Sequence, residues 1–225
     1  MSIFIDSSNI DEIARYHRMG VIRGVTTNPT IMMKDGVRGF HEIQKRSLEI
    51  AKLVAPYPVS VEVMTNDFDE MRHQAIEFSK WAENINIKVT IHGPNGELEN
   101  VALVHELETK HNIRVNVTAM MSAQQCYLAA MAGATYVSLF GGRVNNMGYN
   151  AVHEIRRLRR VLDVNQLKSK IIVGSTREVL NVIEWIDAGA HIVTVTPNLI
   201  EGMLVHPYSK ETISMFLKDA KKILT

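Results

Sequence analysis

One lysine stands in the middle of a segment that otherwise has the pattern of a buried strand. Across residues 85–91 aliphatic residues alternate with polar ones, and this period of two places Lys88 on the face opposite the aliphatic side chains. In a sheet closed into a barrel, that second face points inward. Burial disfavours the charged form of an amine, and a neutral amine is a nucleophile for a carbonyl carbon. The pattern taken alone favours the alternative, an exposed lysine on a half-solvated strand.

Further polar residues fall where other predicted strands end. The full row in chain order is Asp6, Asn28, Glu62, Lys88, Asn116, Thr118 and Ser138. Each of these residue types alone is common in turns and helix caps. A buried polar group without a hydrogen-bond partner lowers the stability of the folded protein by about 1–3 kcal/mol. Several such residues are therefore expected inside one core only when they hydrogen-bond to one another or to a ligand. The row therefore predicts a functional site at one edge of a sheet.

The elements that would position these residues alternate regularly along the chain. Short runs rich in β-branched residues predict strands at 3–6, 24–28, 59–63, 84–91, 114–118, 136–139, 170–173 and 192–195. Helical spacing predicts helices at about 9–19, 40–54, 68–81, 96–110, 122–132, 151–162 and 178–188, with a last helix from Ser209. About eight β/α units without a Gly-rich dinucleotide loop predict an α/β fold, a TIM (β/α)8 barrel that forms a single domain over residues 1–225. In that fold the carboxyl ends of the strands surround the active site.

Composition narrows the class of protein. The 25 Lys and Arg residues nearly balance 24 Asp and Glu residues, so no basic field predicts a nucleic acid or an anionic membrane as partner, and the arginines of 151–162 are interpreted as a solvated or interface face. The single cysteine, Cys126, permits no disulfide within the chain. With no signal segment and no apolar run long enough to span a bilayer, we expect an unprocessed cytoplasmic protein. The histidines lack ligand spacing, so no metal or other cofactor is predicted.

A series of short motifs, in the same order along the chain, resembles the transaldolase family. The motifs are FIDSSN (4–9), GVTTNPT (24–30), VEV (61–63), IKV (87–89), NVT (116–118), GATYVS (133–138) and FGGR (140–143). They are similar to the small single-barrel branch, which also contains fructose-6-phosphate aldolases. The resemblance implies that Lys88 is a Schiff-base lysine and that Asp6 and Glu62 transfer protons. It implies that Thr118 helps Glu62 to hold a catalytic water.

The same resemblance assigns the residues that contact the substrate. Asn28, Asn116 and Ser138 would hydrogen-bond the dihydroxyacetone unit, and Arg143, Ser175 and Arg177 would bind a distal anion. Thr27 and Phe140 are further substrate-binding residues. The chemistry agrees, since a protonated imine accepts the electron pair that is released when a carbon–carbon bond beside a ketone breaks. Paired carboxylates supply the proton transfers, and a guanidinium binds a tetrahedral anion through two hydrogen bonds. A surface charge at Arg177 and a helix cap at Ser175 are the alternative interpretation of the last group.

Two positions favour transfer over release of the dihydroxyacetone unit. The aldolase branch has Gln and Tyr where this chain has Glu62 and Phe140, and both residues follow the transaldolase pattern. The expected donor is an anionic ketose, fructose 6-phosphate or sedoheptulose 7-phosphate, and the acceptor an aldose such as glyceraldehyde 3-phosphate or erythrose 4-phosphate. Further alternatives are a fructose-6-phosphate aldolase and a barrel without catalysis that serves as a scaffold, although the second is disfavoured because Lys88, Asp6 and Glu62 are all present.

Departures from the family pattern gather around the distal end of the substrate. Residues 89–96, Leu139, Gly141 and residues 174–177 all differ from what the family usually has. A donor with another anionic end, such as 6-deoxy-6-sulfofructose, is therefore an alternative, because a few barrel loops can change specificity. The expected partners are small anionic sugars. The resemblance also implies a homo-oligomer similar to ring-forming decamers, in which the last helix packs on a neighbouring subunit.

Overall fold

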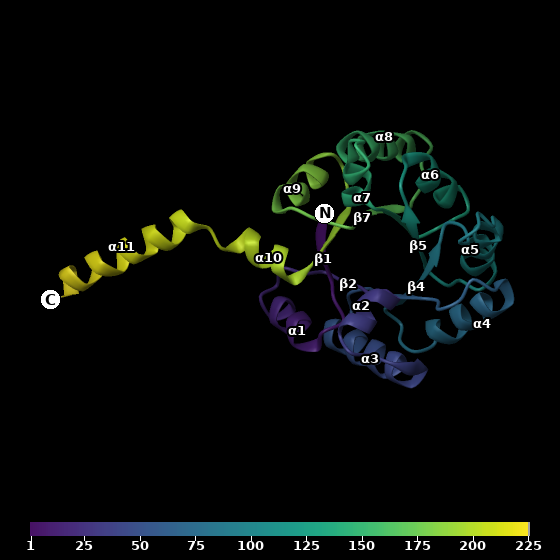
Figure 1. Cartoon of the computed structure of the whole chain (residues 1–225), viewed down its shortest axis with the longest axis horizontal. Helices are drawn as coiled ribbons and strands as arrows, with labels where there is room; N and C mark the ends of the chain where they lie inside the picture. Colours follow the sequence, from purple (N-terminus) through teal and green to yellow (C-terminus); the bar gives the residue numbers. More distant parts are fainter. Residues whose placement is uncertain (225) are drawn as a thin grey trace.

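Eight parallel strands close into one barrel in the computed structural model, which describes residues 1–224 (Figure 1). The strands are β1 (Ser2–Asp6), β2 (Val25–Thr26), β3 (Val59–Glu62), β4 (Ile85–Thr90), β5 (Val115–Met120), β6 (Tyr136–Leu139), β7 (Lys170–Val173) and β8 (Ile192–Val195). Each strand pairs with the next in the chain, and β8 pairs with β1. The predicted single-domain TIM (β/α)8 fold is confirmed, and only residue 225 of the predicted range lies outside the described residues.

Helices surround this barrel, and the last helix of the chain extends away from it (Figure 1). They are α1 (Ile10–Arg18), α2 (Pro29–Lys34), α3 (Gly39–Val54), α4 (Phe68–Ser79), α5 (Glu99–Lys110), α6 (Ala123–Met131), α7 (Gly141–Asn146), α8 (Ala151–Val164), α9 (Val179–Asp187), α10 (Pro197–Leu204) and α11 (Pro207–Leu224). Sequence patterns did not predict α2, α7 and α10, because six or eight residues are too few for a helical period to stand out. On α8, Arg156, Arg157 and Arg160 are exposed, as expected for a solvated or interface face.

The second strand is shorter than the sequence predicts because the chain leaves the sheet to begin α2. Asn28 is the N-cap of this helix, and its side chain accepts a hydrogen bond from the backbone N–H of Ile31 at 2.9 Å. Pro29 occupies the first helical position, where its missing N–H removes no helical hydrogen bond. Pro29 thus helps to begin α2, and this helix lies at the mouth of the barrel.

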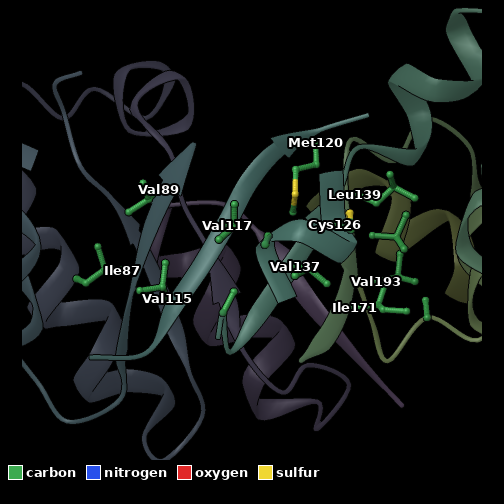
Figure 2. Packing of buried hydrophobic residues seen from close by; sticks show 14 of the residues in the cluster. Ile87, Val89, Val115, Val117, Met120, Cys126, Val137, Leu139, Ile171 and Val193 are labelled. Atoms are coloured by element: carbon green, nitrogen blue, oxygen red, sulfur yellow. The ribbon is translucent and has the colours of Figure 1, made fainter. Parts of the chain in front are cut away.

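Aliphatic side chains on the outer face of the strands pack beneath the helices. Figure 2 shows Ile87 and Val89 of β4 beside Val115 and Val117 of β5, and all four are fully buried. Lys88 lies between two of them in the chain and therefore points to the other face, into the barrel. The alternation predicted for this strand is confirmed.

The inside of the barrel is divided into an apolar side and a polar side. Phe4, Tyr136, Ile172 and Ile192 form a separate apolar cluster from β1, β6, β7 and β8. The Phe4 ring occupies the space beside Gly24, where an added Cβ would lie 2.6 Å from the ring. On β3, β4 and β5 the inward positions carry buried Ser, Asn, Lys and Asn side chains instead. This polar side lies below one half of the barrel mouth.

The last helix departs from the barrel. In Figure 1, α11 extends away from α10 as a separate arm, and none of its residues is buried. Exposed apolar side chains follow one another along this helix, among them Ile213, Phe216 and Leu217. No helix within residues 1–224 combines the length and apolar character needed to cross a membrane.

Candidate active site

A pocket of about 460 Å³ opens at the carboxyl ends of the strands. The predicted site residues that line it are Asp6, Asn28, Glu62, Lys88, Asn116, Thr118, Ser138, Phe140, Arg143, Ser175 and Arg177. They come from segments spread over more than half of the chain, and closure of the barrel brings them together. This location is where the active sites of (β/α)8 barrels lie.

Lys88 is the most enclosed cation of the pocket, with 5% of its surface exposed. Its Nζ donates a hydrogen bond to the backbone carbonyl of Thr27 at 2.8 Å and lies 3.0 Å from Glu62 Oε2. Glu62 is the register partner of Lys88 on the neighbouring strand, so the parallel pairing of β3 with β4 sets the two side chains next to each other. A carboxylate at this distance is placed to exchange a proton with the amine.

Thr27 is the one predicted substrate residue that does not line the pocket. Its hydroxyl donates to the Ser60 carbonyl at 2.9 Å, and its neighbour Thr26 lines the pocket instead. The reason is the alternation of side chains along an extended backbone, which sends consecutive residues to opposite faces. Thr27 therefore acts on the pocket through its backbone carbonyl, which orients the Lys88 amine.

Asp6 lies at the end of β1 beside the lysine and glutamate. Burial raises the pKa of Asp6 above its ordinary value, while the nearby Lys88 charge and a 2.7 Å hydrogen bond from Thr26 Oγ1 oppose this shift and the Glu62 charge adds to it. A carboxyl group whose pKa is raised keeps its proton to higher pH than an ordinary aspartate does. Such a group suits a reaction cycle in which one carboxyl group takes up a proton and later returns it.

Asp6→Asn is expected to stabilise the folded protein, and the gain should grow as the pH rises. The folded state binds the Asp6 proton more tightly than the unfolded chain, so ionisation of Asp6 above a pH of about 4 costs folded stability that asparagine does not lose. Urea unfolding at several pH values between about 4.5 and 8 measures the difference. The Asp187→Asn variant, which removes an exposed carboxylate, is the control for the loss of one negative charge. A gain that shrinks with rising pH would contradict the raised pKa.

The hydroxyl of Thr118 is buried and has no hydrogen-bond partner among residues 1–224. The register of β5 against β6 shifts between Val117 and Met120, and Ala119 within this bulge has a φ of 61°. Bulges redirect side chains and occur often beside active sites. Since Thr118 and Ala119 both line the pocket, a molecule in the pocket is the available partner for the Thr118 hydroxyl.

Two polar side chains on β5 and β6 are linked on the pocket floor. Ser138 Oγ donates to Asn116 Oδ1 at 2.6 Å, and Asn116 Nδ2 donates to Ser60 Oγ at 3.1 Å. Asn116 and Ser138 line the pocket, whereas Ser60 lies below it, one inward position before Glu62 on β3. The links hold the two pocket residues in defined orientations.

The guanidinium groups of the pocket lie on α7 and in the loop after β7. The Arg143 guanidinium carbon is 5.2 Å from the centroid of the Phe140 ring, a cation–π contact. Gly142 allows α7 to touch the β7 loop, because a Cβ at this position would overlap the Ser175 carbonyl oxygen and press on the Arg177 side chain. The close contact brings Arg143, Ser175 and Arg177 to one end of the pocket.

Ser175 is not a helix cap. The N-cap of α9 is Glu178, three residues further on, so the alternative interpretation of Ser175 fails on its position. Ser175 itself has a φ of 60°, in the left-handed region that non-glycine residues adopt rarely and that is common at functional sites. Ser175 lines the pocket together with Arg143 and Arg177.

Several residues that line the pocket were not predicted. They are Thr26, Pro29, Thr30, Ile31, Ala119, Ile172 and Thr194, whereas Gly174, which also lines the pocket, was expected near the distal end of the substrate. For Thr26, Ile172 and Thr194 the signal was present, because they occupy inward positions near the ends of their strands. Thr30 and Ile31 enter with α2, which the sequence pattern did not show. Within residues 1–224 no group of three or more His, Cys, Asp and Glu side chains is arranged to hold a metal ion.

Fold and site together define a (β/α)8-barrel enzyme with a buried lysine and two carboxyl groups at the carboxyl ends of its strands. The chain belongs to the Transaldolase/Fructose-6-phosphate aldolase family, which it matches over residues 3–225. It is 39% identical over 222 residues to "Probable transaldolase 1" of Bacillus cereus, a match that covers 99% of this chain and 98% of that protein. It is 40% identical over 219 residues to "Probable transaldolase 2" of Listeria monocytogenes, covering 97% and 95%. The predicted family is confirmed, and the chain is a transaldolase-type transferase.

Solved structures with low sequence identity share the fold. Dihydrodipicolinate synthase from Rhodopseudomonas palustris superposes with a TM-score of 0.63 at 15% identity, covering 99% of this chain and 80% of that one. Thiamine phosphate pyrophosphorylase from Pyrococcus furiosus gives a TM-score of 0.62 at 9% identity, covering 87% and 85%. At such identities the likeness extends to the barrel architecture alone.

Proposed function

We propose that the protein is a transaldolase that works through a Schiff base on Lys88 and transfers a dihydroxyacetone unit from an anionic ketose to an aldose. The observation that carries this proposal is the buried Lys88 amine, 3.0 Å from Glu62 Oε2 in a pocket that also contains Asp6. An enclosed amine between two carboxyl groups has both a nucleophile and the proton donors and acceptors that imine formation needs.

The reaction begins when the Lys88 amine passes a proton to Glu62 and adds to the C2 carbonyl of the ketose. Loss of water from the resulting carbinolamine gives a protonated imine, and Glu62 is the adjacent group to move the protons. Asp6 then takes the proton of the C4 hydroxyl, the bond between C3 and C4 breaks, and its electron pair moves into the imine to form an enamine. The first aldehyde leaves, and an acceptor aldehyde reverses these steps. Hydrolysis of the new imine returns the free amine.

A water held by Glu62 and Thr118 serves the proton transfers in this proposal. The Thr118 hydroxyl is buried, lacks a partner within residues 1–224 and belongs to the pocket lining, as does Glu62. A water with a carboxylate on one side and a hydroxyl on the other can pass a proton between substrate and protein. The hydroxyl groups of the dihydroxyacetone unit are assigned to Asn28, Asn116 and Ser138.

The anionic end of the donor is assigned to Arg143, Ser175 and Arg177. These residues form one end of the pocket, and the loops after the last strands of (β/α)8 barrels often bind phosphate. Fructose 6-phosphate and sedoheptulose 7-phosphate are the proposed donors, with glyceraldehyde 3-phosphate or erythrose 4-phosphate as acceptor. The departure from the family pattern at Gly174 lines the pocket beside this end, which supports 6-deoxy-6-sulfofructose as the second candidate donor.

A panel of donors and acceptors with identification of the products tests this function. Phosphorylated and sulfonated ketoses are each incubated with and without an aldose acceptor. A transaldolase forms the new ketose and little free dihydroxyacetone, because the enamine waits for an aldehyde. Release of dihydroxyacetone as fast as transfer would make the protein a fructose-6-phosphate aldolase, against the expectation from Glu62 and Phe140. No turnover with any ketose would leave a barrel without catalysis.

The protein is further proposed to assemble into a homo-oligomer through α11. A helix of 18 residues with no buried side chain and with Ile213, Phe216 and Leu217 along it gains stability only against another surface, and a second copy of the chain supplies one. Phe216→Glu is expected to lower the sedimenting mass of the protein, whereas Ser214→Glu, which adds the same charge on the same helix, should not. If both variants have the same sedimenting mass as the parent protein, α11 is not part of the interface.

A further inference from the structure

Asn86 is a buried polar residue that has no role in the proposed mechanism. It lies on β4 two residues before Lys88 and on the same inward face. It is fully buried, and neither its Oδ1 nor its Nδ2 has a hydrogen-bond partner among residues 1–224. A buried amide group without a partner costs about 1–3 kcal/mol, and the opposite side of the barrel interior is filled by apolar residues such as Ile192. The burial of the Asn86 amide without a hydrogen-bond partner therefore needs a physical reason.

Asn86 lies beside the end of a chain of hydrogen bonds that starts in the pocket. Ser138 donates to Asn116, and Asn116 donates to Ser60. Ser60 is the register partner of Asn86 on the neighbouring strand, so their side chains stand next to each other on the inner face. Ser60 accepts from Asn116, and the structure shows no acceptor for its own hydroxyl hydrogen within residues 1–224. The last group of this hydrogen-bond chain is thus the Ser60 hydroxyl, a donor that lies close to the unpartnered amide of Asn86.

A chain of this kind has two possible directions, because an amide side chain can turn by 180° and exchange its donor and acceptor. In the observed direction Ser138 gives its hydrogen to Asn116 and presents lone pairs to the pocket. In the reverse direction Ser60 would donate to Asn116, Asn116 would donate to Ser138, and Ser138 would present its hydrogen to the pocket. Only the observed direction needs an acceptor beyond Ser60, because in the reverse direction the Ser60 hydrogen goes to Asn116.

We propose that Asn86 is this acceptor and hence a positioning residue for the substrate pocket. Its Oδ1 accepts the Ser60 hydrogen through one internal water, since the two side chains are neighbours without a direct hydrogen bond. Internal waters in proteins bind where two to four polar partners surround them, and Ser60 Oγ with both amide atoms of Asn86 meets this condition. Asn86 thereby keeps Ser138 as a hydrogen-bond acceptor for a sugar hydroxyl. This inference rests on the proposed function, in which Asn116 and Ser138 bind the donor ketose.

Replacement of Asn86 by the isosteric pair Val and Thr tests this role. Asn86→Val removes every polar atom and lets the chain reverse, so kcat/KM for the donor ketose is expected to fall about tenfold, mainly through KM. The loss is partial because a sugar hydroxyl can either donate or accept. Asn86→Thr has the same shape with a hydroxyl that can bind the water, and it should recover most of the activity. Stability should not follow activity, since Val leaves no buried polar group unpaired.

Ile192→Val is the matched control, because it removes a methylene group from the apolar side of the same barrel interior. Val and Thr variants with the kcat/KM of the parent would overturn the proposal. If Asn86→Val, Asn86→Thr and Ile192→Val all lower kcat/KM equally and also lower the stability of the protein, Asn86 has a packing role. This result would also overturn the proposal.

A second measurement does not depend on the proposed function. The effects of Ser60→Ala and Asn86→Val on the free energy of unfolding should be non-additive in the double variant, because both residues hold the same water. Additive effects would show that Ser60 and Asn86 do not hold a common water, and this conclusion holds for any substrate. If the effects are non-additive but no ketose is turned over, the hydrogen-bond chain through Asn86 is supported. The proposed function is then refuted instead.

Discussion

Lys88→Met is expected to abolish turnover while the barrel stays folded. Methionine keeps most of the side-chain volume but has no amine, so the proposed imine cannot form, and loss of a covalent nucleophile typically costs about 10⁴-fold or more in kcat. The Glu62 carboxylate that loses its partner faces the pocket, where water can solvate it. Steady-state assays with the best donor and acceptor measure the activity, and circular dichroism with urea unfolding checks the fold.

Lys170→Met is the matched control for this experiment. Lys170 begins β7 at the opposite end of the barrel, where it is exposed, so its replacement should leave activity near that of the parent. Borohydride added with the donor ketose should reduce the imine and attach the sugar carbon skeleton to Lys88, as peptide mass spectrometry would show. Attachment at another lysine, or no attachment in an active preparation, would sink the assignment of Lys88.

Arg177→Ala is expected to reduce kcat/KM for an anionic ketose by a factor of about 30 to 1,000, which corresponds to about 2–4 kcal/mol of transition-state stabilisation. The guanidinium lies at the end of the pocket beside Arg143 and Ser175, where it can bind an anion remote from the reacting carbonyl. Binding energy at that remote group orients the carbonyl towards the Lys88 amine. Uncharged donors of the dihydroxyacetone type do not use this contact, so their reaction should change little.

Arg160→Ala, which removes an exposed guanidinium from α8, is the control for overall charge. An equal loss for charged and uncharged donors in the Arg177 variant would place Arg177 in the structural support of the β7 loop instead of the anion site. The same assays compare the two head groups. If the parent prefers a sulfonated ketose strongly over fructose 6-phosphate, the second candidate donor becomes the first.

Much of the fold was predictable because it depends on local patterns. Alternating side chains on an extended strand and helical spacing between strands are properties of short segments, and they predicted the order of eight strands and the inward direction of Lys88, which the structure confirms. The strand-end residues and motifs predicted the family and the place of the pocket. The helices α2 and α7 were missed, because six residues do not reveal a period, although both line the mouth.

The contacts within the site were less predictable, because they join residues far apart in the chain. Thr26 and not Thr27 faces the pocket, which the alternation of side chains counted from Asn28 could have shown, whereas the predicted end of β2 was wrong by two residues on its carboxyl side. The left-handed backbone at Ala119 and Ser175 has no sequence signal, since glycine is the residue that normally marks it. The need for Gly142 follows from the position of the Ser175 carbonyl, more than 30 residues away.

The sequence by itself determined the barrel, its family and the identity of the groups that could do chemistry, because residue type and period are local properties of the chain. Only the tertiary structure decided which atoms meet. It set the Lys88 amine between the Thr27 carbonyl and Glu62, and it raised the pKa of Asp6 by burial. It also left Asn86 unpartnered beside Ser60. These pairings are set by strand register and barrel closure, in which every strand finds its place only when all the others are present.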